Sequence, residues 1–341
     1  MKQEIITLNS ERNVTLTSYI QEVGGDFHFR KRPAIVVIPG GGYSWCSDRE
    51  ADAVAFAYLK AGYQAFVLRY SIGEYNTWPN PLDDYEMTME LIEKRAEEWG
   101  VDTAKIAAVG FSAGGHLCAC AATIAKRKPA AAILVYPAIM KDVCDICQQG
   151  MPRPNEHVTI DTSPCFIVAA RDDHTVDVKN SILMQLALAE HEVPFESHIY
   201  SYGGHGFSTA EDWIIGEAVS SRVSAWVEDS IGWLKENLGT LTVNGFTKPN
   251  PSVAKNGNAA AVLSVSCSLN HVRKQSEEVL TVLKPLFDGM KAVADSKGYE
   301  MEGLMTAVGA RSIRELMEMA GTDEETIQQL DRVLRDMPNR H

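Results

Sequence analysis

The chain has 341 residues, 45% of them apolar, and a formal net charge of −13. This length is long for one domain, and the apolar share is ample for a packed core. The acidic balance argues against a nucleic-acid partner or an anionic membrane surface, because both require a basic face. No apolar stretch is long enough to span a bilayer, and the first residues do not resemble a signal peptide, so we expect a cytoplasmic protein.

Short apolar runs alternate with helical patterns over the first two thirds of the chain. The first 33 residues predict two or three short strands. Continuous apolar runs, typical of parallel strands covered on both faces, follow at 34–39, 65–70, 105–110, 131–136 and 165–170. Helical patterns lie at about 49–62, 82–99, 113–126, 178–191 and 218–238. This alternation predicts an α/β fold with a doubly wound, mostly parallel sheet.

The pattern changes near residue 239. Residues 239–260 are rich in Gly, Asn, Pro and Lys and predict a linker. The chain should therefore divide into a first domain at 1–238, this linker, and a small helical segment at 261–341. The helical segment carries 13 acidic and 10 basic residues, so most of the net negative charge belongs to the first domain.

Two capping boxes mark helix starts in the C-terminal segment. Ser312 with Glu315, and Thr322 with Glu325, each fit the S/T-x-x-E pattern in which side chains bond the first free N–H groups of a helix. The amphipathic helices behind a linker indicate a possible homo-oligomer formed through this segment.

The chain has seven cysteines, and Cys144 and Cys147 form a C-x-x-C pair. A zinc site would need two more ligands at matched spacing, and a redox pair would need a helix N-terminus to lower one thiol pKa. The sequence offers no second pair. We interpret these thiols as reduced and buried or incidental, and we expect no metal and no organic cofactor.

The stretch GFSAG, residues 110–114, carries the strongest chemical signal. It is a G-x-S-x-G motif after a predicted strand and before a predicted helix. Glycines permit the tight turn, and Ser112 is thereby raised above the edge of the sheet. The free N–H groups at the start of the following helix point to the same place. Ser112 is therefore the candidate nucleophile.

A serine hydroxyl needs a base, and the base needs an orienting acid. In this architecture the acid and then the histidine follow the serine along the chain. Of the nine histidines, His205 fits best, because it lies between glycines on a loop after FESHIYS, which is the last predicted strand. The acid is expected in RDDHTVD, after the run at 165–170. Position alone leaves Asp172, Asp173 and Asp177 open.

Three glycines follow the early strand in VIPGGGYSW, and they offer backbone N–H groups that no side chain covers. Such donors stabilise the oxyanion of an acyl-transfer intermediate. The N–H of Ala113, next to the nucleophile, should be another donor. Three aromatic residues near these motifs, Tyr43, Trp45 and Phe207, are candidates for substrate contact, with packing in the core as the alternative.

These pieces resemble the α/β-hydrolase fold, and more narrowly its acetyl esterase and acetylxylan-esterase-like branch. The resemblance covers about residues 1–238 and is carried by PGGGYSWCSDRE, GFSAGGHL, RDDHTVDVKNS and GGHGF. In relatives the triad acid stands three residues before the valine of a D-x-x-V element, which here is Val176. The resemblance therefore selects Asp173 as the acid. It also implies that Gly41 and Gly42 are the oxyanion donors.

The resemblance implies a serine carboxylester hydrolase that removes short acyl groups, such as acetyl, from sugars or xylo-oligosaccharides. Two residues depart from hormone-sensitive-lipase-like relatives: Pro39 replaces a histidine before the glycines, and Phe111 replaces an acidic residue before the serine. The helical cap of those relatives is also missing, so we expect an open cleft. Amide, formamide or peptide hydrolysis on the same triad is the alternative, and a non-catalytic binding protein is a second one.

Overall fold

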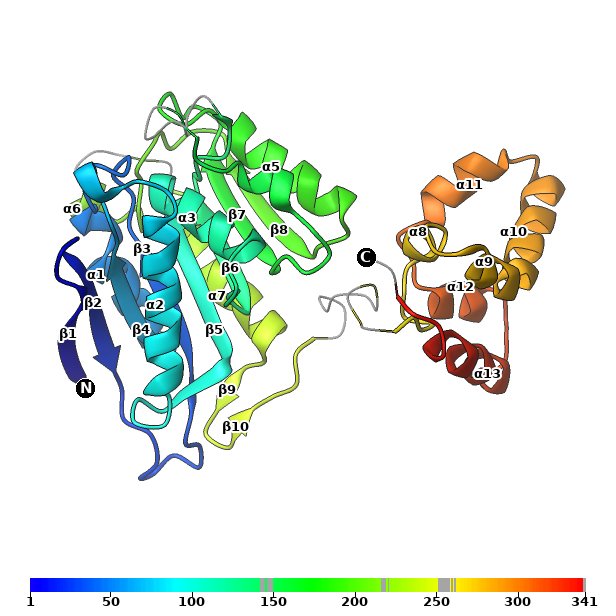
Figure 1. The fold of residues 1–341 in the computed structure, drawn as a ribbon, viewed down its shortest axis with the longest axis horizontal. Helices are drawn as coiled ribbons and strands as arrows, with labels where there is room; N and C mark the ends of the chain where they lie inside the picture. Colours follow the sequence, from blue (N-terminus) through cyan, green and yellow to red (C-terminus); the bar gives the residue numbers. More distant parts are fainter. Residues whose placement is uncertain are drawn as a thin grey trace. The chain divides into compact units, whose positions relative to one another are not determined.

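The computed structural model describes residues 1–141, 145, 150–215, 219, 221–250, 258, 260 and 262–339. The chain divides into two compact units, Met1–Ala254 and Lys255–His341 (Figure 1). Among the described residues, no helix combines the length and the apolar character needed to cross a membrane.

An eight-stranded sheet forms the centre of the first unit, with the strand order β1-β2-β4-β3-β5-β6-β7-β8. The strands are β1 Lys2–Asn9, β2 Val14–Ile20, β3 Arg32–Ile38, β4 Gln64–Arg69, β5 Val101–Phe111, β6 Ala131–Val135, β7 Cys165–Ala170 and β8 Phe195–Tyr200. The pairs β1–β2 and β2–β4 are antiparallel, and every other pair is parallel. The predicted mostly parallel sheet is confirmed, and the carboxyl ends of β3, β5, β6, β7 and β8 lie along one edge (Figure 1).

Helices cover both faces of this sheet, which gives three layers (Figure 1). They are α1 Asp52–Lys60, α2 Asn80–Lys94, α3 Ser112–Thr123, α5 Lys179–Glu190, α6 Asp212–Ile215 and α7 Ala225–Leu238. Alternate residues of β3 belong to two separate cores: Val36 packs with α2, α3 and α5, whereas Val37 packs with α1 and α7. Burial on both faces explains why the strands are continuous apolar runs rather than alternating ones.

The segment after α7 differs from the linker predicted at 239–260. It contains a small hairpin of β9 Leu241–Thr242 and β10 Gly245–Phe246. The N–H of His28 donates to the carbonyl of Val243 at 2.9 Å, and the ammonium of Lys105 lies 4.6 Å from the ring centroid of Phe246. Residues 239–247 are therefore fastened to the first unit, and a composition rich in Gly and Asn here reflects a hairpin turn.

Helices make up the second unit, as predicted. They are α8 Leu269–Val272, α9 Glu277–Val282, α10 Lys284–Lys297, α11 Met301–Val308, α12 Ile313–Met319 and α13 Glu324–Arg335. The capping box of Ser312 with Glu315 is confirmed at the start of α12. The second one is wrong, because the side chain of Asp323, and not of Thr322, accepts from the Thr326 N–H and caps α13.

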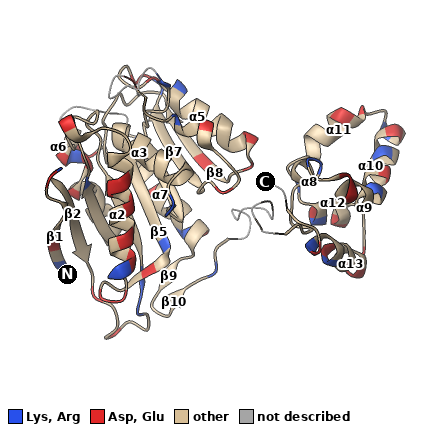
Figure 2. Ribbon diagram, viewed as in Figure 1, with Lys and Arg blue, Asp and Glu red and all other residues tan. Residues whose placement is uncertain are grey.

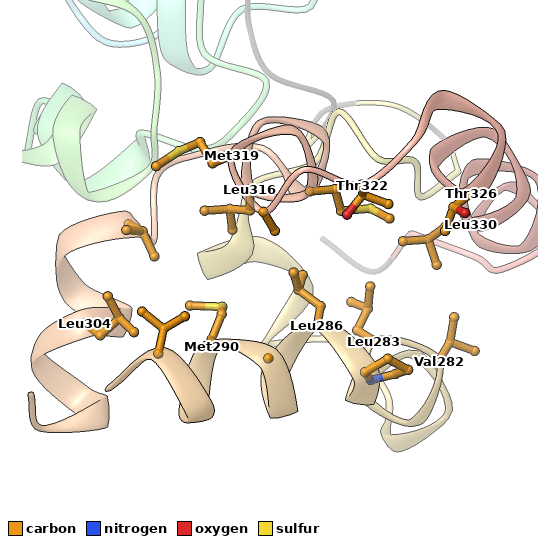
Figure 3. Close-up of a pocket in the computed structure, with 16 residues that line it drawn as sticks. Val282, Leu283, Leu286, Met290, Leu304, Leu316, Met319, Thr322, Thr326 and Leu330 are labelled. Atoms are coloured by element: carbon orange, nitrogen blue, oxygen red, sulfur yellow. The ribbon is translucent and has the colours of Figure 1, made fainter. Parts of the chain in front are cut away.

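An apolar pocket of about 530 Å³ lies among the helices of the second unit (Figure 3). Its walls are aliphatic and thioether side chains, including Leu286, Met290, Leu304, Leu316 and Leu330. The pocket shows that these short helices leave part of their apolar surface without a partner.

Acidic side chains follow the length of α2 (Figure 2). Three of them, Glu86, Glu90 and Glu93, form ion pairs with Arg127 at 3.5, 3.9 and 3.1 Å. Each exposed ion pair of this kind contributes little to the free energy of folding. They nevertheless offset part of the negative charge on this face.

Candidate active site

Ser112 lies at the turn between β5 and α3, and its backbone has a φ of 52°. The turn leaves no room for a side chain at Gly110 or Gly114, which lie two residues before and two residues after the serine. A Cβ at Gly110 would collide with the carbonyl of Gly114, and a Cβ at Gly114 would collide with the carbonyls of Ile38 and Pro39 at the end of β3. The G-x-S-x-G spacing thus lets strand and helix approach closely, and it presents the hydroxyl at the carboxyl edge of the sheet.

His205 lies between Ser112 and Asp173. Its Nε2 is 2.9 Å from Ser112 Oγ, and its Nδ1 is 2.7 Å from Asp173 Oδ2. Because a carboxylate only accepts, the Nδ1–H of His205 donates to Asp173, and the lone pair of Nε2 faces the serine hydroxyl. The Asp173 side chain is 1% exposed and the His205 side chain 20%. This is the tautomer and orientation that a general base for Ser112 needs.

The loop after β7 holds Asp173 through its own backbone. The N–H groups of Thr175 and Val176 both donate to Asp173 Oδ1 at 2.8 Å. Oδ1 is occupied by this turn, so Oδ2 is left for the histidine. The D-x-x-V spacing therefore describes a carboxylate that caps its own turn.

The other two candidate acids, Asp172 and Asp177, accept hydrogen bonds from other groups. Asp172 Oδ1 accepts from the N–H groups of Gly203 and Gly204 at 2.9 and 3.0 Å. The hydrogen bond from the Gly204 N–H, together with that from Gly203, holds the pKa of Asp172 below its usual range. Asp177 accepts from the Lys179 N–H at the start of α5. Of the three candidates, the structure brings Asp173 to the histidine, while Asp172 anchors the loop that carries it.

The glycine loop after β3 lies beside the elbow. Gly41 and Gly42 have φ values of 128° and 59°, which favour glycine, and a Cβ at Gly41 would collide with the carbonyl of Trp45. The Gly41 carbonyl accepts from the N–H groups of Ser44 and Trp45 at 3.0 and 3.3 Å, which fixes the turn. Ala113 is the second residue of α3, where helix N–H groups have no intrahelical acceptor. The glycine loop and the start of α3 thus lie next to Ser112, and the oxyanion role of the Gly41, Gly42 and Ala113 N–H groups stays a prediction.

Comparisons with known proteins place this geometry in a family. An α/β-hydrolase enzyme from a Medee basin deep-sea metagenome library is 36% identical; the match covers 70% of this chain and 98% of that one, with a TM-score of 0.66. This chain belongs to the α/β-hydrolase family. Residues 27–146 also match the family model described as BD-FAE.

Two curated relatives have named activities. The chain is 30% identical to an acetylxylan esterase from Xylanibacter ruminicola, over 62% of this chain and 50% of that protein. It is 31% identical to endo-1,4-beta-xylanase B from Butyrivibrio fibrisolvens, over 53% of this chain and 33% of that protein. The chain thus spans between a third and a half of the length of these relatives.

The three predicted substrate-contact residues divide into two kinds. Trp45 is 60% exposed in the loop after the glycines, whereas Tyr43 and Phe207 are each 1% exposed. Phe207 packs edge-on against Tyr136, with ring centroids 4.6 Å apart. Because their rings are buried in the core of the first unit, Tyr43 and Phe207 are packing residues. Only Trp45 of the three has a face free to meet a substrate.

Tyr43 is fastened to the nucleophile helix through His116. The Tyr43 hydroxyl is 2.7 Å from His116 Nδ1, and His116 Nε2 is 2.8 Å from the carbonyl of Pro152. Since a carbonyl only accepts, Nε2–H donates to Pro152 and the Tyr43 O–H donates to Nδ1. Burial lowers the pKa of His116 to about 4, so the ring is neutral near pH 7. This bond ties the loop of residues 39–43, the predicted oxyanion loop, to α3.

Sequence reasoning missed two polar residues beneath the site, Glu50 and Tyr136. Glu50 is 4% exposed, and its two oxygens accept from the Gly40 N–H at 2.8 Å and from the Tyr136 hydroxyl at 2.7 Å. Tyr136 follows β6, and its position at the carboxyl end of a parallel strand was the available signal. Nothing in the polar run SDRE indicates that Glu50 is buried.

A cavity of about 330 Å³ lies beside His205, lined among others by Arg49, Asp172, Tyr202 and Ile215. Within the described ranges of the chain, no cluster of three His, Cys, Asp or Glu side chains could hold a metal. Cys144 and Cys147 lie outside the described residues.

Proposed function

We propose that this protein is a serine carboxylester hydrolase that removes short acyl groups, chiefly acetyl, from sugars or xylo-oligosaccharides. The observation that carries the proposal is the line of hydrogen bonds from Ser112 Oγ through His205 to Asp173. A nucleophile within reach of a base, itself oriented by an acid, is the arrangement that acyl transfer requires.

In the first half of the reaction, His205 Nε2 takes the proton of Ser112 as Oγ attacks the ester carbonyl carbon. The carbonyl oxygen becomes an oxyanion, which the N–H groups of Gly41, Gly42 and Ala113 stabilise. Asp173 stabilises the imidazolium that forms. His205 then protonates the departing alcohol oxygen, and the acyl group stays on Ser112.

Water completes the cycle in the second half. His205 takes a proton from water as its oxygen attacks the acyl-serine carbonyl. A second oxyanion forms in the same place, and its collapse breaks the bond to Oγ. The proton on His205 returns to Ser112, and the carboxylic acid leaves.

Two relatives and one exposed aromatic ring support the substrate class. One relative is named an acetylxylan esterase and another a xylanase. The exposed ring of Trp45 next to the oxyanion loop suits stacking on a sugar.

The test compares hydrolysis of p-nitrophenyl acetate and of acetylated xylo-oligosaccharides by the wild type and by Ser112→Ala. We expect the wild type to act on both and Ser112→Ala to lose at least about 10⁴-fold in kcat. Ser201→Ala, which removes an exposed hydroxyl on the loop leading to His205, is the matched control and should stay within about twofold of the wild type.

Each other outcome corrects a stated part of the proposal. Activity on the small ester alone would contradict the sugar substrate and keep the serine mechanism. A preference for formamides or peptides in a parallel panel would replace ester by amide chemistry. Full activity in Ser112→Ala would contradict the nucleophile.

A further inference from the structure

Glu50 is a buried carboxylate in the middle of the site, outside the Ser–His–Asp line. It follows the oxyanion loop in the 3-10 turn Asp48–Glu50, and both of its oxygens accept hydrogen bonds. A methyl group at Gly40 would contact both Glu50 Oε2 and Ser112 Cβ, so the carboxylate lies close under the nucleophile. Fully buried carboxylates are rare in proteins unless they are paired with charges or hydrogen-bond donors.

The bonds of Tyr136 show which groups donate. Its oxygen lies 3.0 Å from the Ser208 N–H, which can only donate. The Tyr136 O–H is therefore free to donate to Glu50 Oε1, while the Gly40 N–H donates to Oε2. Both oxygens of Glu50 are acceptors, which suits an ionised carboxylate.

Ser208 carries this chain of bonds to the histidine loop. It is fully buried, its Oγ donates to the carbonyl of Arg49 at 2.6 Å, and its carbonyl accepts from Trp226 Nε1 at 2.9 Å. His205 lies three residues earlier, and its ring centroid is 4.9 Å from that of Tyr136. The oxyanion loop and the loop of the base are thus joined through Glu50 and Tyr136.

We propose that Glu50 is a positioning residue for acyl transfer: its charge stabilises the imidazolium of His205, and its two hydrogen bonds hold the oxyanion loop and the histidine loop in one geometry. The inference rests on the proposed function of Ser112 and His205. It goes beyond the triad because it gives the site a second buried carboxylate besides Asp173.

Other charged and titratable groups face the same ring and set the background. Asp173 binds Nδ1, and Asp172, Arg49 and Tyr202 line the cavity beside the ring. Burial raises the pKa of Glu50, and the nearby His205, Arg49 and two hydrogen bonds act in the opposite direction. A negative charge near an imidazole favours its protonated form.

The test follows the sulfonylation of Ser112 by phenylmethanesulfonyl fluoride between about pH 5 and 9, by mass spectrometry. The Oγ–S bond forms, the S–F bond breaks, fluoride leaves and His205 takes the hydroxyl proton. This readout measures the serine directly. A failure of the ester substrates would therefore contradict the proposed function without affecting the comparison of variants.

Glu50→Gln removes the charge and keeps the shape. We expect the plateau rate of labelling to fall about tenfold to a hundredfold, because the loops lose their common anchor. We also expect the acid limb of the pH profile to move to lower pH by about half a unit or more, because the imidazolium loses a favourable charge. Asp48→Asn, which removes a charge from an 88% exposed side chain of the same turn, is the control and should leave the limb in place.

Tyr136→Phe separates the two parts of the proposal. It keeps the charge of Glu50 and deletes the hydroxyl that joins Glu50 to the Ser208 N–H. The plateau rate of labelling should therefore fall while the acid limb stays in place. Should Glu50→Gln not fold, Glu50→Asp keeps the charge but draws the carboxylate away from Gly40. The pattern expected for Glu50→Asp is that of Tyr136→Phe, a lower plateau rate with the acid limb in place. An acid limb that does not move in folded Glu50→Gln, an unchanged plateau in Glu50→Asp, or an unlabelled wild-type Ser112 would overturn the inference.

Discussion

The two units of the chain are packed on different principles. The core of the second unit consists of apolar side chains from short amphipathic helices, and a pocket of about 530 Å³ remains among them. The first unit also buries titratable groups, among them Glu50, His116 and Asp173, and each of these has specific hydrogen-bond partners. A buried polar group must be satisfied in one geometry, whereas apolar contacts tolerate several. The comparison teaches that the polar groups define the site and the apolar contacts only support it.

The largest effect expected from this difference is at Gly41. Gly41→Ala puts a Cβ against the carbonyl of Trp45 and displaces a proposed oxyanion donor, so kcat should fall about 10²- to 10³-fold. The kcat of the variant is measured from ester hydrolysis at saturating substrate concentration. Gly25→Ala, also at a positive φ but in open space, is the matched control and should keep its kcat. An unchanged kcat in Gly41→Ala would mean that the site tolerates looser geometry than its polar contacts indicate.

The second prediction concerns the apolar core of the second unit. Ile313 is fully buried at the start of α12, and Ile313→Ala should lower the unfolding free energy of this unit by about 2–5 kcal/mol. All six tryptophans lie in the first unit, so their fluorescence should report no change, while helical circular dichroism should. Val333→Ala, at a 45% exposed position, is the control. Lost ester hydrolysis in Ile313→Ala would break the comparison, because it would couple the two units.

The third prediction is a pH dependence confined to the first unit. The pKa of His116 is lowered to about 4 in the folded state from an ordinary value near 6.5, so the unfolded state binds the proton more tightly. Its contribution to stability is present above pH 6.5 and is lost as the pH falls toward 4, about 2 kcal/mol of it by pH 5.

Urea unfolding followed by tryptophan fluorescence at pH 7 and pH 5 measures this loss. His116→Gln should show a smaller loss than the wild type by that amount, and His28→Gln, at an exposed position, should behave as the wild type does. Equal losses in the wild type and His116→Gln would show that the buried ring is not what makes the first unit sensitive to acid.

The parts of the site that could be predicted are those that the sheet itself places. Ser112 follows a strand whose apolar run is unmistakable, and His205 follows the mixed strand β8. Parallel strands deliver their carboxyl ends to one edge of the sheet. The roles of Asp172 and Asp173 could not be separated from position, because they are adjacent on one loop. What separates them is the N–H groups of Gly203 and Gly204, about thirty residues later in the chain.

Other parts depended on burial, which a single sequence does not show. Glu50 lies in a run as polar as any surface turn, and Tyr43 and Phe207 look the same as Trp45 in sequence although only Trp45 is exposed. The cap of α13 was misplaced by one residue, because Thr322 and Asp323 are both good capping residues. For Glu50 and Phe207 the deciding contact comes from Tyr136, which is distant in the chain, whereas the cap of α13 is decided by a local bond from the Thr326 N–H to Asp323.

The φ of 52° at Ser112 has a consequence for the evolution of this chain. A side chain in the left-handed region costs about 1–2 kcal/mol, a strain that glycine would relieve. Selection for stability alone would therefore favour glycine at position 112, and with it the loss of the hydroxyl. A serine retained against that gradient marks a trade of folding stability for reactivity.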